Sequence, residues 1–244
     1  MSLQRQLLAW NEGRGDVESL HRAITEHPDW RVLESAEGGF TPLVDEHGQA
    51  WVTLFVDDDA LYEFTQATGY TPERVGRAPG YVVFKTMLDG AHGVQLNPHL
   101  PMALHFTMAE HGSQLARWGD AVFVEQVLAD PAMVDDPFAV YRNYGGYQVV
   151  VVKGSDGAER LAMAPDARGR QLVAIFTAND SAQAYVQANR ARLPGTPRVL
   201  HFSGSKLFST LEKRQMDGMV FNCSGPIPPR AFQPAFAAKV LQGA

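Results

Sequence analysis

The chain carries the stretch Gly48-Gln-Ala-Trp-Val-Thr-Leu-Phe-Val-Asp-Asp-Asp59, and Gly169-Arg-Gln-Leu-Val-Ala-Ile-Phe-Thr-Ala-Asn-Asp180 repeats it at a constant offset. In both, an apolar run typical of a β-strand follows a glycine and leads into the start of a helix. The likeness continues downstream, where Gly80, Phe84 and Gly93–Asn97 match Gly204, Phe208 and Gly218–Asn222. A repeat near half the chain length predicts a duplicated structural unit.

The duplication predicts two similar lobes, residues 1–114 and 115–244, in a chain of 244 residues. Each unit is expected to run helix, three mostly antiparallel strands, helix, strand, helix, strand, helix. Helical crossovers between the later strands imply some parallel pairing. The expected fold class is therefore α+β or mixed α/β: two tandem repeats, each a mixed β-sheet covered by helices, related by a pseudo-twofold.

Several local signals place the elements. The spacing of apolar residues predicts a helix over 17–27, which Pro28 ends, and a strand from Trp30 to Leu33. Asp57 is expected to cap the helix at 60–67, and Thr177 with Asp180 matches a capping box. Closing helices are expected at about 102–110 and 230–241. The segment 131–147, an insert rich in Tyr and Phe, has no expected counterpart in the first copy.

Composition excludes some classes of function. The formal charge of −6, with 27 acidic and 21 basic residues, opposes a nucleic-acid partner. Cys223 is the only cysteine, so no intramolecular disulfide can form and nothing demands an oxidising compartment. The sequence shows neither a secretory signal nor an apolar run of ~18 residues, so we expect a cytoplasmic protein without a membrane partner. Glycine-rich nucleotide-binding motifs are missing, so no cofactor is expected.

Three segments of the second copy resemble the SseB-like family of bacterial proteins: Val173–Ala182, Ser203–Leu211 and Asp217–Asn222. The similarity is strongest over 159–222, looser over 40–97 and missing in the insert. It implies two tandem SseB-like lobes and brings no settled biochemical activity with it. The Asn-Pro pair usual at the last turn of the family stands at Asn97-Pro98, whereas the second copy has Asn222-Cys223.

Two residues are candidate nucleophiles. A Cys223 thiolate could act with His201 or His99 as base. Because Cys223 occupies the position of Pro98 in the other copy, a structural role is favoured. Ser203 and Lys206 match the Ser-x-x-Lys spacing of serine acylases, but Ser203 also suits the cap of a helix, which we favour.

Two acidic or histidine-rich patterns could suggest a metal. Asp57, Asp58 and Asp59 are consecutive, which suits the start of a helix better than a cation site. His99, His105 and His111 recur at intervals of six, which does not place them on one helical face. No metal site is therefore expected.

We expect a non-enzymatic adaptor that binds a protein or a small ligand in a groove between the lobes. The residues expected to bind are Asn97, His99, Asn222, Cys223 and Ser224 in paired turns, with Tyr141 and Tyr144 of the insert. Tyrosines with flexible glycines suit an interface, although they could also pack the insert onto its lobe. Two alternatives stay open: a hydrolase or transferase using Cys223 or Ser203, and an immunity or chaperone-like partner of a secreted protein. The sequence does not specify the oligomeric state.

Overall fold

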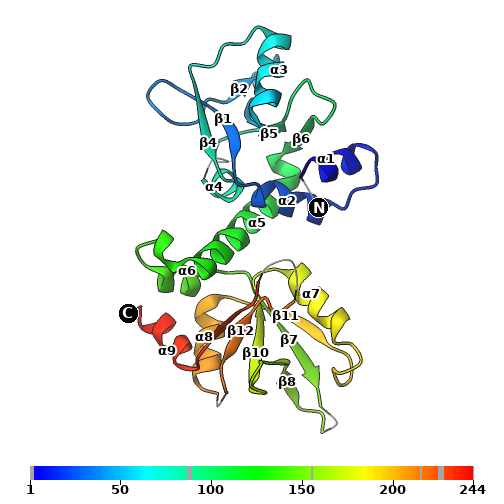
Figure 1. Cartoon of the computed structure of the whole chain (residues 1–244), viewed down its shortest axis with the longest axis vertical. Coiled ribbons are helices and arrows are strands. Elements are labelled where there is room, and N and C mark those ends of the chain that lie inside the picture. Colours follow the sequence, from blue (N-terminus) through cyan, green and yellow to red (C-terminus); the bar gives the residue numbers. More distant parts are fainter. Residues whose placement is uncertain (1–2, 87–89, 155, 215, 225–227, 244) are drawn as a thin grey trace. The chain divides into compact units, whose positions relative to one another are not determined.

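The computed structural model describes residues 3–86, 90–154, 156–214, 216–224 and 228–243. The chain divides into two compact units, Met1–Phe123 and Val124–Ala244, here called the first and second lobes (Figure 1). Each lobe is a mixed β-sheet with helices packed against it. No helix in the described ranges is both long enough and apolar enough to span a bilayer.

The first lobe begins with two helices and then builds its sheet. Its elements are α1 (Leu3–Asn11), α2 (Val17–Glu26), β1 (Trp30–Glu34), β2 (Leu43–Val44), β3 (Ala50–Phe55), α3 (Asp58–Thr68), β4 (Arg74–Ala78), α4 (Gly80–Thr86), β5 (Gly93–Leu96), β6 (Leu104–Thr107) and the start of α5 (Met108–Ala129). The strand order is β4-β1-β3-β5-β6, with β2 beside β3. The pair β3 and β5 is parallel, and the other pairs are antiparallel.

The second lobe repeats this plan. After α5 come a 3-10 turn (Pro131–Met133), α6 (Pro137–Asn143), β7 (Tyr147–Lys153), β8 (Glu159–Leu161), β9 (Met163–Pro165), β10 (Gln171–Phe176), α7 (Asn179–Ala188), β11 (Arg198–Phe202), α8 (Gly204–Glu212), β12 (Met219–Phe221), β13 (Arg230–Phe232) and α9 (Ala235–Gln242). The strand order β11-β7-β10-β12-β13 matches the first lobe, and β10 and β12 form the parallel pair. The predicted duplication and the predicted fold class, a mixed β-sheet covered by helices in each repeat, are confirmed.

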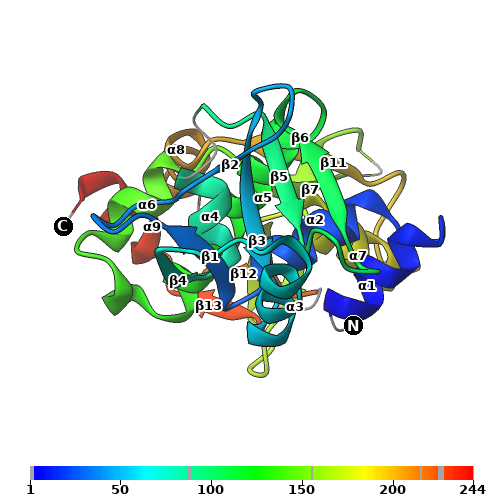
Figure 2. The same cartoon turned by 90° about the horizontal axis from the view of Figure 1, so that it is seen from above.

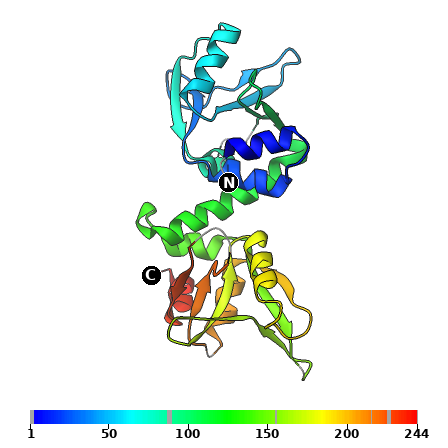
Figure 3. The same cartoon turned by 45° about the vertical axis from the view of Figure 1, so that its right-hand side comes forward.

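The central strand of each lobe is buried on both faces, which explains its unbroken apolar run. In the first lobe α3 lies beside β3 (Figure 2). The Phe64 ring of α3 packs on the Phe55 ring of β3, with 5.1 Å between their centroids. On the other face the Trp30 indole donates a hydrogen bond to the Ile24 carbonyl of α2. In the second lobe α7, drawn in yellow, lies on one side of the sheet, and α8 and α9, in orange and red, lie on the other (Figure 3).

The helix α5 contributes to both lobes. Near its middle, Leu115 is fully buried in the core of the first lobe. Near its end, the Val127 carbonyl accepts a hydrogen bond from the Tyr141 hydroxyl of α6. The boundary expected between residues 114 and 115 falls inside this helix.

The expected closing helices begin later than the sequence suggested, because a strand precedes each. Residues 104–107 form β6 and residues 230–232 form β13, each paired antiparallel with the strand before it. Leu104 and Phe106 are buried while His105 is exposed, the alternation of a strand with one face on the core. The prolines upstream therefore precede a strand, and helices follow only at Met108 and Ala235.

The expectation that the insert has no counterpart in the first copy is wrong, because α6 takes the place of the end of α2. The Gly80 amide donates to the His27 carbonyl at 2.7 Å, and the Gly204 amide donates to the Tyr144 carbonyl at 2.7 Å. Each glycine also lies so close to its helix that a Cβ would come within 2.2 Å of a carbonyl oxygen. The acceptors are backbone atoms, which any residue can supply, so the sequences of α2 and α6 were free to diverge.

The capping predictions at Asp57 and Thr177 have opposite outcomes. Asp57 caps α3, since its carboxylate accepts the Ala60 amide at 2.8 Å. The capping box at Thr177 is wrong: Ala178 is the N-cap of α7, and the Thr177 hydroxyl donates to the buried carboxylate of Glu125. The predicted helix over 17–27 and the strand from Trp30 are confirmed as α2 and β1.

Candidate functional site

In each lobe the two parallel strands end at the same sheet edge, where ligands of α/β sheets commonly bind. We call this the carboxyl edge. Asn97 follows β5 there and Asn222 follows β12; both have left-handed backbones, with φ of 45° and 51°. The Asn97 side-chain oxygen accepts the Val56 amide at 2.9 Å, and that of Asn222 accepts the Thr177 amide at 3.0 Å. Both side chains are buried, so they tie the parallel strands together within their own lobes.

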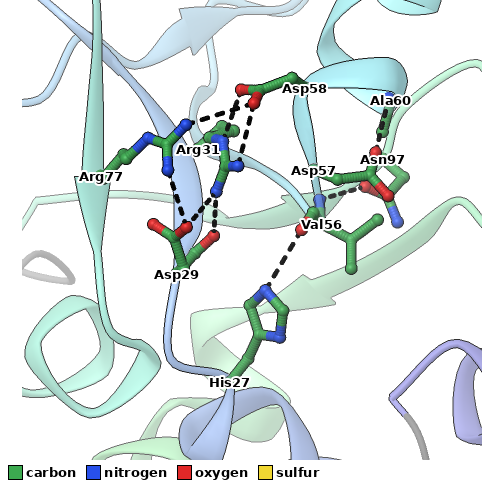
Figure 4. Close-up of polar contacts among 9 residues, drawn as sticks. All are labelled: His27, Asp29, Arg31, Val56, Asp57, Asp58, Ala60, Arg77 and Asn97. Carbon is green, nitrogen blue, oxygen red and sulfur yellow. Dashed lines mark hydrogen bonds and ion pairs between the residues drawn. The ribbon is translucent and has the colours of Figure 1, made fainter.

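At the carboxyl edge of the first lobe, four charged residues are linked by ion pairs (Figure 4). The buried Arg31 guanidinium donates to both carboxylate oxygens of Asp58, at 2.6 and 3.1 Å, and lies 2.7 Å from Asp29. Arg77 bridges the same two carboxylates at 3.1 and 3.2 Å. The hydrogen bond from Arg31 lowers the pKa of Asp58. These contacts fix the start of α3 against β1 and β4.

The second lobe has no such charges at the equivalent positions. Gln148 pairs with Phe176 and His201 as Arg31 pairs with Phe55 and Arg77. Asn179 opens α7 where Asp58 opens α3. The charged cluster is therefore specific to the first lobe. Its two arginines and two aspartates neutralise one another and leave no net charge for a ligand.

The carboxyl edge of the second lobe instead holds a buried polar group of three residues. The Thr177 hydroxyl donates to Glu125 at 2.5 Å and accepts from the Asn222 side-chain amide at 2.9 Å. Beside them lies a cavity of about 50 Å³ whose lining includes Phe221 and Arg230. Such a space suits ordered water rather than an organic ligand.

Cys223 is partly buried against the apolar cluster that contains Phe176 and Tyr185. Burial raises the pKa of its thiol to about 11, so little thiolate exists at neutral pH. This opposes the nucleophile hypothesis. Ser224 is partly exposed beside it, and His201 is exposed on β11.

Ser203 and Lys206 do not form a catalytic pair. Ser203 stands at the N-cap position of α8, as expected, but its hydroxyl makes no capping hydrogen bond. The Lys206 ammonium lies over the Phe202 ring, 5.5 Å from its centroid. Neither residue is arranged as an activated nucleophile or its base.

Tyr141 and Tyr144 are used by the fold. Tyr141 is 2% exposed, and its hydroxyl donates to the Val127 carbonyl at 3.0 Å. The Tyr144 hydroxyl donates to the Thr177 carbonyl at 2.5 Å. Of the two roles considered for the insert, these contacts support packing.

The remaining expected residues are distributed over the two lobes. His99, in the first lobe, has a left-handed backbone with φ of 69°, and its exposed ring packs on Phe64. The inter-lobe groove that should bring it near Cys223 stays a prediction. No three His, Cys, Asp or Glu residues gather at metal-binding distance within the described part of the chain.

A further hollow, in the second lobe, was not foreseen from the sequence. It has a volume of about 610 Å³ and lies at the far end of β7 and β11; we call it the β7–β11 hollow. Its lining residues are Val151, Lys153, Gly154, Glu159, Pro194, Gly195, Thr196 and Arg198.

In the first lobe the counterparts of the two segments that build this hollow are less developed. The β8 strand, which carries Glu159, matches only an isolated bridge in the first lobe. The loop before β11 is also longer: Asp180 and Gly204 are 24 positions apart, whereas Asp59 and Gly80 are 21 apart. In the sequence, this site could have been found from the spacing between matching residues of the two copies, which increases between Asp180 and Gly204.

Comparison with known proteins adds little. No family model matches the chain, and no curated protein matches it. One solved structure that is similar is Anabaena Tic22, assigned to protein transport, with 12% identity, coverage of 82% of this chain and 88% of that one, and a TM-score of 0.23. A likeness at that score supports no conclusion about function.

Proposed function

We propose that this protein is a non-enzymatic binding module whose ligand site is the β7–β11 hollow of the second lobe. The observation that carries the proposal is the volume of about 610 Å³, within the range of roughly 300–1,000 Å³ typical of ligand pockets. Both segments that build the hollow are extended relative to their counterparts in the first lobe. Because the shared features of the copies serve the fold, a difference that creates a cavity is the better candidate for function.

The lining suits binding rather than catalysis. Val151 and Pro194 offer apolar surface, whereas Lys153, Thr196 and Arg198 offer hydrogen-bond donors. Cys223 and Ser203, the candidate nucleophiles, are not among the lining residues. The raised pKa of Cys223 further disfavours the hydrolase or transferase alternative.

The sequence-based expectation of an SseB-like adaptor in the bacterial cytoplasm belongs to the same proposal. It rests on the resemblance of Val173–Ala182, Ser203–Leu211 and Asp217–Asn222 and on the single cysteine. A binding module fits a family without a settled catalytic activity.

The test compares two tryptophan variants. Thr196→Trp places a large side chain in the hollow, and Thr71→Trp places one on the exposed loop before β4, the equivalent edge strand of the first lobe. Each ¹⁵N-labelled protein is titrated with a panel of small organic acids and amides. Amide shifts should centre on Gly154 and Gly195 in wild type and Thr71→Trp and vanish in Thr196→Trp. Shifts centred elsewhere, equal shifts in Thr196→Trp, or no shifts at all would overturn the proposal.

A further inference from the structure

The donors around the β7–β11 hollow outnumber the acceptors. Lys153 is exposed and forms no ion pair with any residue that the structure describes. Arg198 pairs with Glu159 at 2.8 Å, so the one carboxylate among the described residues of the lining already has a partner. The lining therefore carries one uncompensated positive charge, although the chain as a whole has a formal charge of −6.

Backbone groups add to this imbalance. The loop residues Gly195 and Thr196 make no backbone or side-chain hydrogen bond through their amides within the described ranges. Gly195 has a left-handed backbone, with φ of 62°, and a Cβ there would lie 3.2 Å from the Lys153 carbonyl oxygen. The loop thus runs close beside Lys153, and its free amides belong to the same lining as the ammonium.

We propose that the β7–β11 hollow binds a ligand through an anionic oxygen group, a carboxylate or a phosphate, held by the Lys153 ammonium. An ammonium with amide and hydroxyl donors nearby offers charge-assisted hydrogen bonds that an anion satisfies. Val151 and Pro194 would contact the apolar part of the ligand. This inference rests on the proposed function and specifies the chemistry of the ligand.

The test uses succinate, inorganic phosphate and neutral succinamide as probes, titrated into the whole ¹⁵N-labelled chain. Succinate, phosphate or both should shift the amide signals of Gly195 and Thr196, and succinamide should bind at least about tenfold more weakly. The two anions distinguish a carboxylate ligand from a phosphate ligand.

Variants of Lys153 test whether its ammonium group binds the anion. Lys153→Gln should weaken anion binding at least about tenfold, and Lys153→Arg should keep most of it. Lys213→Gln, which removes an exposed lysine at the end of α8, is the matched control and should bind like wild type. Circular dichroism checks that each variant is folded.

Two results would overturn the inference and leave the proposed function standing: uncharged probes that bind in the hollow as well as anions do, or anion binding that survives in Lys153→Gln. If no acid or amide perturbs the hollow at all, the proposed function fails with it.

Discussion

His27 and Tyr144 occupy equivalent positions in the two lobes and make the same contact with different chemistry. The His27 ring nitrogen lies 3.2 Å from the Val56 carbonyl oxygen, and the Tyr144 hydroxyl lies 2.5 Å from the Thr177 carbonyl oxygen. Each side chain follows the helix before the first strand and binds the residue after the central strand. The duplication has conserved a hydrogen bond rather than a residue.

Replacing Tyr144 with Phe should therefore cost stability. The variant leaves the Thr177 carbonyl without this donor, which should lower the free energy of unfolding by about 1 kcal/mol. Urea denaturation measures the change. Tyr62→Phe, at a tyrosine that is 64% exposed on α3, should have no measurable effect. Equal stability of Tyr144→Phe and wild type would refute a structural role for this hydroxyl.

Asn97 should be sensitive to both its side chain and its backbone conformation. Asn97→Gly keeps the left-handed φ but loses the bond to the Val56 amide, which should cost about 1–3 kcal/mol. Asn97→Ala should cost about 1 kcal/mol more, because alanine is strained at positive φ. Thermal or urea unfolding of the two variants ranks their stabilities. An Asn97→Ala variant as stable as Asn97→Gly would contradict the prediction.

Gly204 should not tolerate a methyl group. A Cβ would come within 2.2 Å of the Tyr141 carbonyl oxygen, so Gly204→Ala should separate α8 from α6 and cost about 1–3 kcal/mol or more. Gly145→Ala is the control, because a Cβ there meets no atom within 4 Å. Similar unfolding midpoints for the two variants would show that the close approach does not matter.

Stability should fall as the pH is lowered from 6.5 towards 4, because of His21. Burial, with the nearby His111 as a second cause, lowers the pKa of His21 from 6.5 to about 4. Between these values the unfolded chain binds a proton that the folded chain does not, so the folded state loses about 2 kcal/mol by pH 5. His21→Gln should lose less stability than wild type between pH 7 and pH 5. Identical pH dependence in both proteins would exclude this source.

Cys223 should react slowly with iodoacetamide at neutral pH. Because burial raises the pKa of the thiol to about 11, the rate should lie below that of free cysteine. The rate should also keep rising as the pH passes the ordinary pKa of a thiol. Circular dichroism at each pH checks that the chain is still folded. A rate that levels off near neutral pH would revive the thiol-enzyme alternative.

The fold could be predicted from the sequence at positions where both copies have the same residue and that residue has the same structural role. Phe55 and Phe176 fill the cores, Gly80 and Gly204 permit close packing, and both terminal asparagines need a left-handed turn. The sequence did not reveal that α6 is the counterpart of the end of α2, because its contact with Gly204 is made by backbone carbonyls. It also did not reveal β6, because the prolines before this strand were interpreted as the start of a helix.

The candidate site was less predictable. The sequence predicted that Asn222, Tyr141 and Tyr144 bind a ligand or partner, because they are polar or aromatic. Their polar atoms instead form hydrogen bonds within the second lobe. The β7–β11 hollow arises because the loop at Gly195 returns to the end of β7, more than forty residues earlier in the sequence. In the sequence, the only sign of this hollow is the longer stretch between Asp180 and Gly204.

The helix α5 limits how the lobes can be produced as separate fragments. A cut at the sequence-based boundary after residue 114 would remove Leu115 from the first core, together with Trp118, which lies under the Arg22 guanidinium. A second fragment that starts after α5 would lose Glu125 and the Val127 carbonyl. Fragments meant to fold alone must therefore overlap, with both 1–129 and 108–244 including this helix, so equal halves of the gene do not encode two independent proteins.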